Sequence, residues 1–308
     1  MAKTLVTGGA GFIGSHLVEA LISNKQDVVV IDNLSTGFKS NLHPKTKFYQ
    51  VDICSTVMDR IFKKEKFDYL FHYAAQVDVR KSLENPIFDV EVNISGSLNL
   101  LKNCQKYGIK KVIFASSGGA IYGEQNYFPA DEKHLELPIS PYGVAKLSVE
   151  KYLHFYKEIY RVPYVALRYS NIYGPRQNPK GDSGVVAIFS QRLLSNHSLT
   201  TYGDGNQTRD YLFVEDAVRA ALLAWQSESY GAFNIGTGKE TDVNQLYHLI
   251  KSKCNSKSKV QYAPFRAGEQ RRSCIDSSKA RKLLDWKPRF DLDSGLDLTL
   301  KYYAEKVN

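Results

Sequence analysis

Short apolar runs alternate with amphipathic segments along the first half of the chain. Runs rich in Val, Ile, Leu, Phe and Tyr predict strands, and apolar residues at three- and four-residue spacing between them, as in residues 12–21, predict helices. The predicted strands cover residues 5–6, 28–31, 47–51, 69–73, 111–115 and 164–168. Alternation of strands and helices at this spacing favours βαβ units and a parallel sheet.

Two of the predicted helices are long and begin with a polar cap followed by proline. Asn85-Pro86 begins the first, which carries apolar residues along one side as far as Cys104. Ser140-Pro141 begins the second, which continues to about residue 160. Each helix has more apolar surface than one sheet face requires. The extra stripe either covers the sheet or contacts another helix.

The pattern changes after Gly174-Pro175, where the segments become shorter and more varied. Loops are predicted at residues 177–184 and 203–209, then a helix at 214–225, a strand at 233–235 and two late helices. We therefore predict an α/β fold with a doubly wound parallel sheet in residues 1–173, joined by a returning segment near 208–236. Residues 174–308 are predicted to form a smaller mixed α/β domain over the carboxyl edge of the sheet, where ligands of such folds bind.

Composition describes an ordered globular chain of 308 residues with 43% hydrophobic residues. The net charge of +9 raises the question of nucleic-acid binding. The basic residues are scattered as short pairs, so we expect solvated faces and no nucleic-acid partner. Four such pairs are Lys63-Lys64, Lys110-Lys111, Arg271-Arg272 and Arg281-Lys282.

Cysteine usage and hydropathy suggest an intracellular protein. Cys54, Cys104, Cys254 and Cys274 lie far apart and form no CxxC pair, so neither a metal site nor a disulfide framework is expected. No apolar run approaches the roughly 18 residues of a membrane span, and the first strand begins too early for a signal peptide. The chain is predicted to be cytoplasmic, with no membrane partner.

A glycine-rich turn joins the first strand to the first helix. Residues 4–15 read TLVTGGAGFIGS, which places Gly8, Gly11 and Gly14 between the two elements. Glycine permits positive φ and close approach of a ligand to the backbone, and a helix N-terminus favours a pyrophosphate. Asp32 ends the second strand about twenty residues later, where an acid accepts hydrogen bonds from a ribose and repels a 2′-phosphate. The pattern predicts a Rossmann domain that binds NAD rather than NADP; the alternative is an ordinary glycine-rich turn.

Tyr142 and Lys146 are the strongest candidates for proton transfer. They lie four residues apart in a predicted helix, so their side chains share a face. Lowering the pKa of tyrosine from about 10 to near 7 requires about 4 kcal/mol, which one ammonium at about 4 Å supplies in an effective dielectric of about 20. Ser117, at the end of the fifth strand, offers a hydroxyl to a sugar oxygen. The alternative is a surface Tyr and Lys on an amphipathic helix.

The motifs together resemble the extended short-chain dehydrogenase/reductase family over the whole length of the chain. In its first part these are TGGAGFIG, DNLSTG at 32–37, Asp52-Ile53, Ala74-Ala75-Gln76, Asn93, Ser117, YGVAK at 142–146 and RYSN at 168–171. GPRQ at 174–177, GVV at 184–186, GDG at 203–205, RDY at 209–211 and RAGE at 266–269 follow in order. Within the family the chain is most similar to nucleotide-sugar 4-epimerases. The strand-end motif has one residue more before Ile121-Tyr122 than the better-known epimerases, which leaves Ser116 or Ser117 as the catalytic hydroxyl; we favour Ser117.

The resemblance implies an NAD-dependent isomerase that interconverts UDP-glucose and UDP-galactose by transient oxidation at C4. Ser117, Tyr142 and Lys146 would be catalytic, no metal would be needed, and the long helices would form a homodimer through a four-helix bundle. The implied NAD-binding residues are Gly8, Gly11, Phe12, Ile13, Gly14, Asp32, Asn33, Ser35, Thr36, Gly37, Asp52, Ile53, Ala74, Ala75, Gln76, Asn93, Tyr142 and Lys146.

The resemblance also implies a UDP-sugar site in the second domain, with arginines on the diphosphate. The alternative for Arg209 and Arg266 is an ion pair with Asp210, Glu215 or Glu269. Ser273 stands where some relatives carry a bulky tyrosine, so N-acetylated UDP-hexosamines are further candidate substrates. The implied substrate-binding residues are Ser117, Asn171, Val185, Thr201, Tyr202, Arg209, Arg266, Glu269 and Ser273.

Three other functions agree less well with the sequence. A nucleotide-sugar 4,6-dehydratase or decarboxylase would use the same Tyr–Lys pair, but dehydratases resembling this chain place Asp-Glu where Gly118-Gly119 stand. A non-catalytic NAD-binding sensor would be expected to lose Tyr142 or Lys146, and both are present. Nucleic-acid binding rests on net charge alone and is the weakest alternative.

Overall fold

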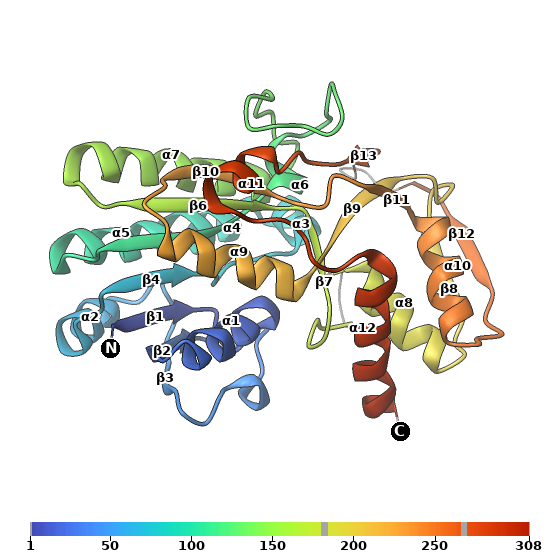
Figure 1. Cartoon of the computed structure of the whole chain (residues 1–308), viewed down its shortest axis with the longest axis horizontal. Helices are drawn as coiled ribbons and strands as arrows, with labels where there is room; N and C mark the ends of the chain where they lie inside the picture. Colours follow the sequence, from blue (N-terminus) through green and yellow to red (C-terminus); the bar gives the residue numbers. More distant parts are fainter. Residues whose placement is uncertain (1, 180–183, 266–269, 308) are drawn as a thin grey trace.

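The main sheet has seven parallel strands in the order β10-β6-β5-β4-β1-β2-β3 (Figure 1). It is seen in a computed structural model that describes residues 2–179, 184–265 and 270–307. The strands are β1 Lys3–Thr7, β2 Asp27–Asp32, β3 Lys47–Gln50, β4 Tyr69–His72, β5 Lys111–Ser117, β6 Tyr164–Tyr169 and β10 Gly231–Ile235. β1, β2 and β6 are buried almost throughout, as expected for strands covered on both faces.

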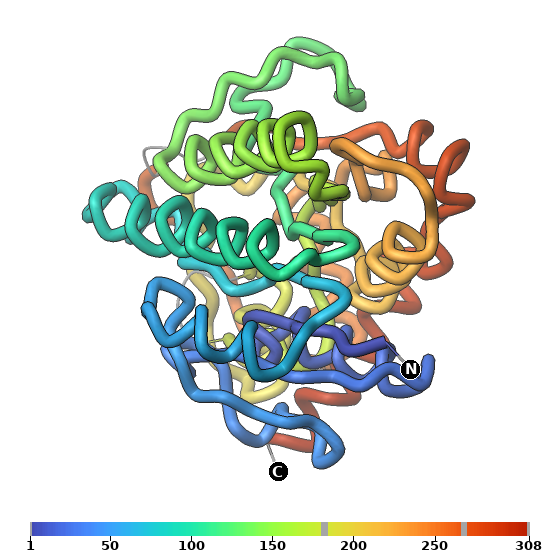
Figure 2. The backbone as a smooth tube through the Cα atoms, turned by 90° about the vertical axis from the view of Figure 1, so that its left-hand side faces the viewer, coloured from blue at the N-terminus to red at the C-terminus, as the bar shows by residue number. Residues whose placement is uncertain are grey.

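Helices cover both faces of this sheet, and each face has its own apolar core. Side chains of α1 Phe12–Ser23, α9 Val214–Gln226 and α11 Ser278–Leu284 fill one core. Side chains of α2 Val57–Glu65, α5 Gly96–Tyr107 and α7 Pro141–Tyr160 fill the other. Figure 2 shows α5 and α7 running side by side over their face. The predicted doubly wound parallel sheet is confirmed.

A smaller α/β layer stands beside the carboxyl ends of the main strands (Figure 1). β9 Thr208–Phe213 pairs with β7 Asn171–Tyr173, β11 Glu240–Asp242 and β13 Arg272–Ser273, and β8 Leu199–Tyr202 pairs with β12 Val260–Ala263. α8 Val185–Leu194, α10 Val243–Lys253 and α12 Leu292–Val307 surround a third apolar core. This part is the predicted smaller mixed α/β unit.

The chain crosses between the two parts more than once. Residues 214–235 return to the main sheet as α9 and β10, whereas β9 stays in the smaller sheet. Residues 278–286, which the sequence analysis placed in the second domain, pack on the first core through Ala280, Leu284 and Trp286. The domain boundary at 173/174 stays a prediction.

The segment predicted as one long helix from Asn85 is divided in the structure. α3 Val79–Glu84 and α4 Pro86–Asp89 precede the π-helical turn η2 Val90–Ser95, and α5 begins only at Gly96. A Cβ on Gly96 would lie 2.7 Å from Cδ1 of Ile53, so a side chain there would require the Ile53 side chain to move. The wider turn brings Asp89 and Asn93 inward, and such turns are frequent at functional sites.

Two further short helices, η1 Lys39–Asn41 and α6 Gly118–Ile121, complete the described elements. No helix in this part of the chain combines the length and apolar character needed to cross a membrane. Among the same residues, no cluster of three His, Cys, Asp or Glu side chains is placed to hold a metal ion.

Candidate active site

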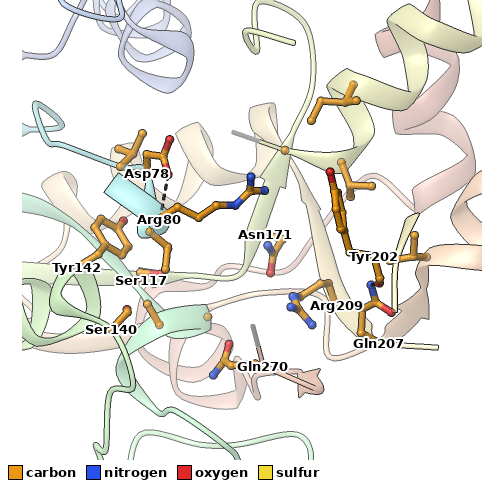
Figure 3. A pocket seen from close by; sticks show the side chains of 18 of the residues that line it. Asp78, Arg80, Ser117, Ser140, Tyr142, Asn171, Tyr202, Gln207, Arg209 and Gln270 are labelled. Atoms are coloured by element: carbon orange, nitrogen blue, oxygen red, sulfur yellow. Dashed lines mark hydrogen bonds between the residues drawn. The ribbon is translucent and has the colours of Figure 1, made fainter. Parts of the chain in front are cut away.

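A cavity of about 650 Å³ lies at the carboxyl ends of the main strands and extends into the smaller part of the molecule (Figure 3). Ser117 and Tyr142 lie at one end of the cavity. Tyr202 and Arg209 lie at the opposite end, with Asn171 between. The position agrees with the general rule that ligands of doubly wound sheets bind beyond the carboxyl ends of the strands.

The start of α7 positions Tyr142 at the cavity. The Ser140 side chain accepts a hydrogen bond from the backbone N–H of Gly143 at 3.2 Å, and Pro141 occupies the first helical position. A Cβ on Gly143 would lie 2.6 Å from the carbonyl oxygen of Ala120, so only glycine lets α7 approach the strand end this closely. The predicted helix start is therefore present, with Tyr142 in its first turn.

The pKa of Tyr142 differs from what the sequence arithmetic assumed. Burial raises its pKa well above the usual range, the charge of Asp89 raises it further, and a hydrogen bond with the Ser117 side chain lowers it. Lys146 is not among these influences: its Nζ lies 5.7 Å from the centre of the Tyr142 ring and donates to the Ala115 carbonyl at 2.8 Å. The arithmetic from the sequence left out desolvation, which raises the pKa of Tyr142. The expectation that the Lys146 ammonium activates the phenol stays a prediction.

Lys146 is itself a perturbed group. Burial lowers its pKa to about 8, and the carboxylates of Asp89 and Glu150 act in the opposite direction. Its side chain is buried, and Nζ lies 4.8 Å from the centre of the Phe114 ring. A lysine with a pKa this near neutrality, beside a tyrosine in a cavity, is typical of a catalytic site.

The structure separates Ser116 from Ser117. Consecutive residues of a strand face opposite sides of the sheet. The Ser116 hydroxyl is buried and donates to Oε1 of Glu150 at 2.6 Å, whereas Ser117 lines the cavity and hydrogen-bonds Tyr142. The geometry favours Ser117 as the hydroxyl that could meet a substrate.

The glycine-rich turn is built as a close-packed cradle. Gly8 has a φ of +73°, and a Cβ on Gly14 would lie 2.1 Å from the carbonyl oxygen of Gly8. The turn is closed by a hydrogen bond from Gly11 N to Gly8 O at 3.0 Å, and α1 begins at Phe12 and Ile13. These backbone positions leave no space for side chains, which fits a dinucleotide pyrophosphate at the start of α1.

The acidic positions after β2 and β3 are held in place by hydrogen bonds. Asp32 is buried and accepts from the backbone N–H of Ala10 at 3.0 Å and of Leu34 at 2.8 Å. Asn33 donates to Oδ2 of Asp52 at 2.8 Å. A carboxylate oxygen accepts more than one hydrogen bond, so Asp32 retains capacity for a ribose hydroxyl. The structure thus places these residues where an adenosine could lie.

The remaining predicted cofactor residues surround the same edge. Ser35 N donates to Oδ1 of Asn33 at 2.9 Å, and Ala74 N donates to the Thr7 hydroxyl at 3.3 Å. The Asn93 side chain binds the Gln76 backbone in both directions, at 2.9 Å each. Of the other predicted cofactor residues, Gly37 lies against Ala10 of the glycine-rich turn and Ile53 lies against Gly96. Thr36 follows β2 and Ala75 follows β4 in the chain.

The substrate residues predicted from sequence are brought together in part. Asn171, Val185, Thr201, Tyr202 and Arg209 line the cavity. Arg266 and Glu269 lie outside the described residues. The alternative partner of Arg209, Asp210, instead accepts hydrogen bonds from Thr237 and Gly238.

Ser273 lies beside the catalytic end of the cavity rather than on its open surface. It is buried, and a Cβ built on Gly119 would lie 3.8 Å from its Oγ. The same point lies 3.6 Å from Oδ1 of Asn171 and 4.0 Å from Oγ of Ser117. The side chains of Ser117, Asn171 and Ser273 therefore surround the position that a side chain at residue 119 would occupy.

Sequence reasoning missed several residues that line the cavity. Ser170, Gln207 and Tyr211 are among those missed. Ser170 Oγ, Gln207 Oε1 and Tyr211 Oη, together with Oγ1 of the predicted Thr201, are buried and have no hydrogen-bond partner among the described residues. Unpaired buried polar atoms are costly and are usually completed by a ligand or water. Tyr211 could have been found from its i, i+2 spacing with Arg209 on one strand face. Gln207 and the cavity-lining Arg80, Arg192 and Gln270 gave no comparable signal.

Comparison with known proteins gives consistent matches. Residues 4–236 match the NAD dependent epimerase/dehydratase family. A putative UDP-glucose 4-epimerase from Methanocaldococcus jannaschii is 47% identical over 95% of each chain. The crystal structure of a UDP-glucose 4-epimerase from Thermotoga maritima with UDP-glucose superposes with a TM-score of 0.98 at 47% identity, covering 99% of this chain and 100% of that one. A UDP-glucose 4-epimerase from Thermus thermophilus in complex with NAD gives 0.95 at 40% identity and 98% coverage of both. The chain therefore belongs to the NAD dependent epimerase/dehydratase family.

Proposed function

We propose that this protein is a UDP-glucose 4-epimerase, an NAD-dependent isomerase that interconverts UDP-glucose and UDP-galactose. The observation that carries the proposal is one cavity lined by Ser117 and Tyr142 at one end and by Asn171 and Arg209 toward the other. Similarity to UDP-glucose 4-epimerases over nearly the whole chain supports the substrate.

The cofactor would lie along the glycine cradle. The backbone of Gly8–Gly14 would hold the pyrophosphate, Asp32 and Asn33 the adenosine ribose, and Lys146 the nicotinamide ribose. NAD bound there would supply the redox chemistry, as the acceptor and donor of the hydride at sugar C4. Since the cofactor is regenerated in each turnover, its site needs to retain it rather than release it.

Tyr142 is the residue that moves the proton. Its phenol oxygen takes the proton from the sugar 4-hydroxyl and gives it back when C4 is reduced again. Ser117, hydrogen-bonded to Tyr142, holds the same sugar oxygen in line. Lys146 would place a positive charge near the phenolate and so favour its formation.

The substrate end holds the nucleotide and leaves the hexose free to turn. We infer that Arg209 and Arg266 neutralise the diphosphate and that Thr201 and Tyr202 hold the uridine. The cavity end at Gly119, Asn171 and Ser273 carries only small side chains, which favours acceptance of an N-acetyl group at sugar C2. Incubation with UDP-GalNAc tests this; no conversion at high enzyme concentration removes the wider specificity.

The experiment that tests the main proposal is incubation of purified protein with UDP-galactose and, separately, UDP-glucose, with products resolved by chromatography. We expect each to yield the same equilibrium mixture without added NAD. Tyr142→Phe should lower the rate by roughly 10²–10⁴-fold while bound NAD is retained. Formation of a 4-keto-6-deoxy sugar would instead establish the dehydratase. Absence of any turnover together with unchanged bound cofactor would establish the sensor.

We also infer a homodimer built through α4, α5 and α7. Ile87 is 68% exposed and Val144 48%, and an apolar groove of about 440 Å³ lies between Pro86, Val90, Ile94 and Val144. Exposed apolar surface of this kind usually marks an interface. Light scattering on the wild type and on Val144→Asp tests it; a wild-type monomer would reject the dimer.

We further infer that the protein acts in a reducing compartment such as the cytoplasm. All four cysteines are free thiols, and burial raises the pKa of Cys54, Cys254 and Cys274 to between about 11 and about 12. Localisation of a tagged chain tests this.

A further inference from the structure

The short helix α4 exposes apolar side chains and buries a charged one, which is the reverse of an ordinary surface helix. Ile87, Phe88 and Val90 are 68%, 46% and 43% exposed, whereas the aspartate between them, Asp89, is completely buried. Burying a carboxylate is costly unless its charge is used or compensated. What matters is therefore which groups the buried Asp89 carboxylate interacts with on the side of α4 that faces the active site.

Asp89 is only half satisfied by hydrogen bonds. Its Oδ1 accepts from Nε2 of Gln76 at 2.9 Å and from Nδ2 of Asn93 at 3.0 Å, which is the arrangement that stabilises a carboxylate. Its Oδ2 is buried and has no partner among the described residues. The amides hold the carboxylate in one orientation, and its second oxygen keeps an uncompensated charge.

That charge reaches the proton-transfer pair. α4 and η2 pack directly against α7, which carries both Tyr142 and Lys146. Burial is the largest cause of both pKa shifts, and among the described residues Asp89 is the charged group that acts on both: it raises the pKa of Tyr142 and opposes the lowering of the pKa of Lys146. Both effects keep the proton on the phenol and on the ammonium.

We propose that Asp89 is a positioning residue of the proposed epimerase, a buried counter-charge that makes Tyr142 a stronger base. The inference rests on the proposed function, in which Tyr142 exchanges a proton with the sugar. A carboxylate near the phenolate opposes its formation, so it increases the tendency of the phenolate to take a proton from the 4-hydroxyl. Asp89 acts through Tyr142 and does not line the cavity.

The other charged groups around the pair are accounted for. Glu150, on α7, acts on Lys146 and is also the partner of the buried Arg168 of β6. His72 of β4 lies close enough to Lys146 for the lysine to lower the pKa of the imidazole. Among the described residues, the charged or titratable groups that interact with Tyr142 or Lys146 are Asp89 of α4, Glu150 of α7 and His72 of β4. Asp78, which caps α3, and Arg80 of α3 line the same cavity as Tyr142.

The test is the pH profile of kcat/KM with UDP-galactose for the wild type, Asp89→Asn and the control Glu91→Gln. Asparagine is isosteric, and its Oδ1 can still accept from Gln76 and Asn93. We expect the ascending acid limb of Asp89→Asn to move by roughly one unit to lower pH, with a plateau a few-fold lower because the base is weaker. Glu91 is an exposed carboxylate two residues away, so its removal changes the net charge equally without moving the profile.

A second readout does not depend on turnover. Tyrosinate absorbance is followed during an alkaline titration of the NAD-bound protein, and Tyr142→Phe identifies the contribution of Tyr142. That contribution should appear at lower pH in Asp89→Asn. If the wild type does not epimerise, the proposed function fails, while this titration still decides whether Asp89 acts on Tyr142.

An unmoved profile and an unmoved tyrosinate signal in folded, NAD-bound Asp89→Asn would overturn the proposal. Melting temperature and NAD content show whether the variant is folded. Asp89→Ser, a smaller neutral residue that can still accept from Asn93, is the second variant and must shift the profile in the same direction. If neither variant folds, Asp89 is a structural residue and the proposal is wrong.

Discussion

Two parts of the site differ in how their polar groups are satisfied. Along the cofactor edge, defined here by Gly8–Gly14, Asp32–Asn33 and Gln76 with Asn93, the polar groups are hydrogen-bonded to one another. On the substrate wall, defined by Ser170, Thr201, Gln207 and Tyr211, each residue has a buried polar atom with no partner among the described residues. The first part is satisfied by the protein's own hydrogen bonds, and the second is not satisfied by the described residues.

The difference corresponds to two kinds of ligand. A cofactor that stays bound is best held by a rigid, preorganised edge, because little freedom remains to be lost on binding. A substrate that leaves after each turnover can supply the missing hydrogen bonds itself. It follows that changes at the cofactor edge should affect folding or retention of NAD, whereas changes on the substrate wall should affect KM and leave stability unchanged.

The largest effect is expected from Gly14→Ala at the cofactor edge. The added Cβ would lie 2.1 Å from the backbone oxygen of Gly8, so the turn must open and its N–H groups lose their alignment. We expect the purified variant to contain less than about one hundredth of the NAD of the wild type, a loss of about 3 kcal/mol. Cofactor is measured by chromatography after denaturation.

Gly108→Ala is the matched control for Gly14→Ala. Gly108 ends α5 with a φ of +71°, and a Cβ there has nothing within 4 Å. It should lose about 1 kcal/mol of stability because of its backbone conformation, with normal NAD content. Equal NAD content in both variants would show that the cradle does not hold the cofactor.

Asn93→Ala should be the most destabilising side-chain truncation at this edge. Asn93 is buried and binds both the N–H and the carbonyl of Gln76 as well as Asp89. Its removal leaves these groups unpaired, which should lower the free energy of unfolding by about 2–3 kcal/mol in urea. Asn24→Ala removes an exposed amide that donates to Ala20 O, and it should change stability by no more than about 0.5 kcal/mol.

The two parts also differ in how far sequence predicts them. The cofactor edge is encoded locally, since the glycines, Asp32 and Asn33 follow consecutive strands and need only the parallel sheet to bring them together. The substrate wall is assembled from residues 170 to 211, whose approach depends on β7, β8 and β9 in a separate sheet. Only motif resemblance identified part of it, and Gln207 and Ser170 were missed.

Local geometry at the proton-transfer site escaped prediction for another reason. Helical periodicity treats residues 85–104 as one helix, and it cannot reveal the π-turn that brings Asp89 inward. The choice between Ser116 and Ser117 depends on which side of β5 each faces. The pKa of Tyr142 depends on burial, which spacing along a helix does not give.

A buried hydrogen-bond chain beneath the cofactor edge predicts acid sensitivity. His72 lies between Thr7 and Ser97, at 2.8 Å from each hydroxyl, and burial lowers its pKa to about 3. Because this value lies below the 6.5 of an unfolded histidine, the unfolded chain binds the proton more readily. Stability is then complete above pH 6.5 and decreases as the pH falls, by about 2 kcal/mol between pH 7 and pH 5.

Urea unfolding at pH 7 and pH 5 checks this contribution against His72→Gln. Glutamine can still accept from Thr7 and donate to Ser97 but does not titrate. The variant should lose less stability between the two pH values than the wild type, by about 2 kcal/mol. Equal losses in both proteins would assign the acid sensitivity to other groups.

Lys146 lies where the two parts meet and predicts an alkaline limit to activity. Its pKa of about 8 means that the ammonium is lost above that pH, together with its stabilisation of the phenolate. We expect kcat/KM to fall about tenfold per pH unit well above pH 8. In Lys146→Arg the charge persists at all accessible pH values, so its lower activity should show no such decline.

The smallest effect is expected from Tyr211→Phe on the substrate wall, and it is the sharpest test of the comparison. The Tyr211 hydroxyl is buried and has no hydrogen-bond partner among the described residues, so its removal breaks no hydrogen bond with them. The melting temperature should stay the same or rise slightly, because a desolvated hydroxyl is lost. If the bound substrate forms a hydrogen bond with this hydroxyl, the variant's KM for UDP-galactose should rise about 5-fold, equivalent to about 1 kcal/mol, with kcat little changed. A loss of stability with unchanged KM would mean that the Tyr211 hydroxyl stabilises the fold and does not contact the substrate. The distinction between the cofactor edge and the substrate wall would then fail.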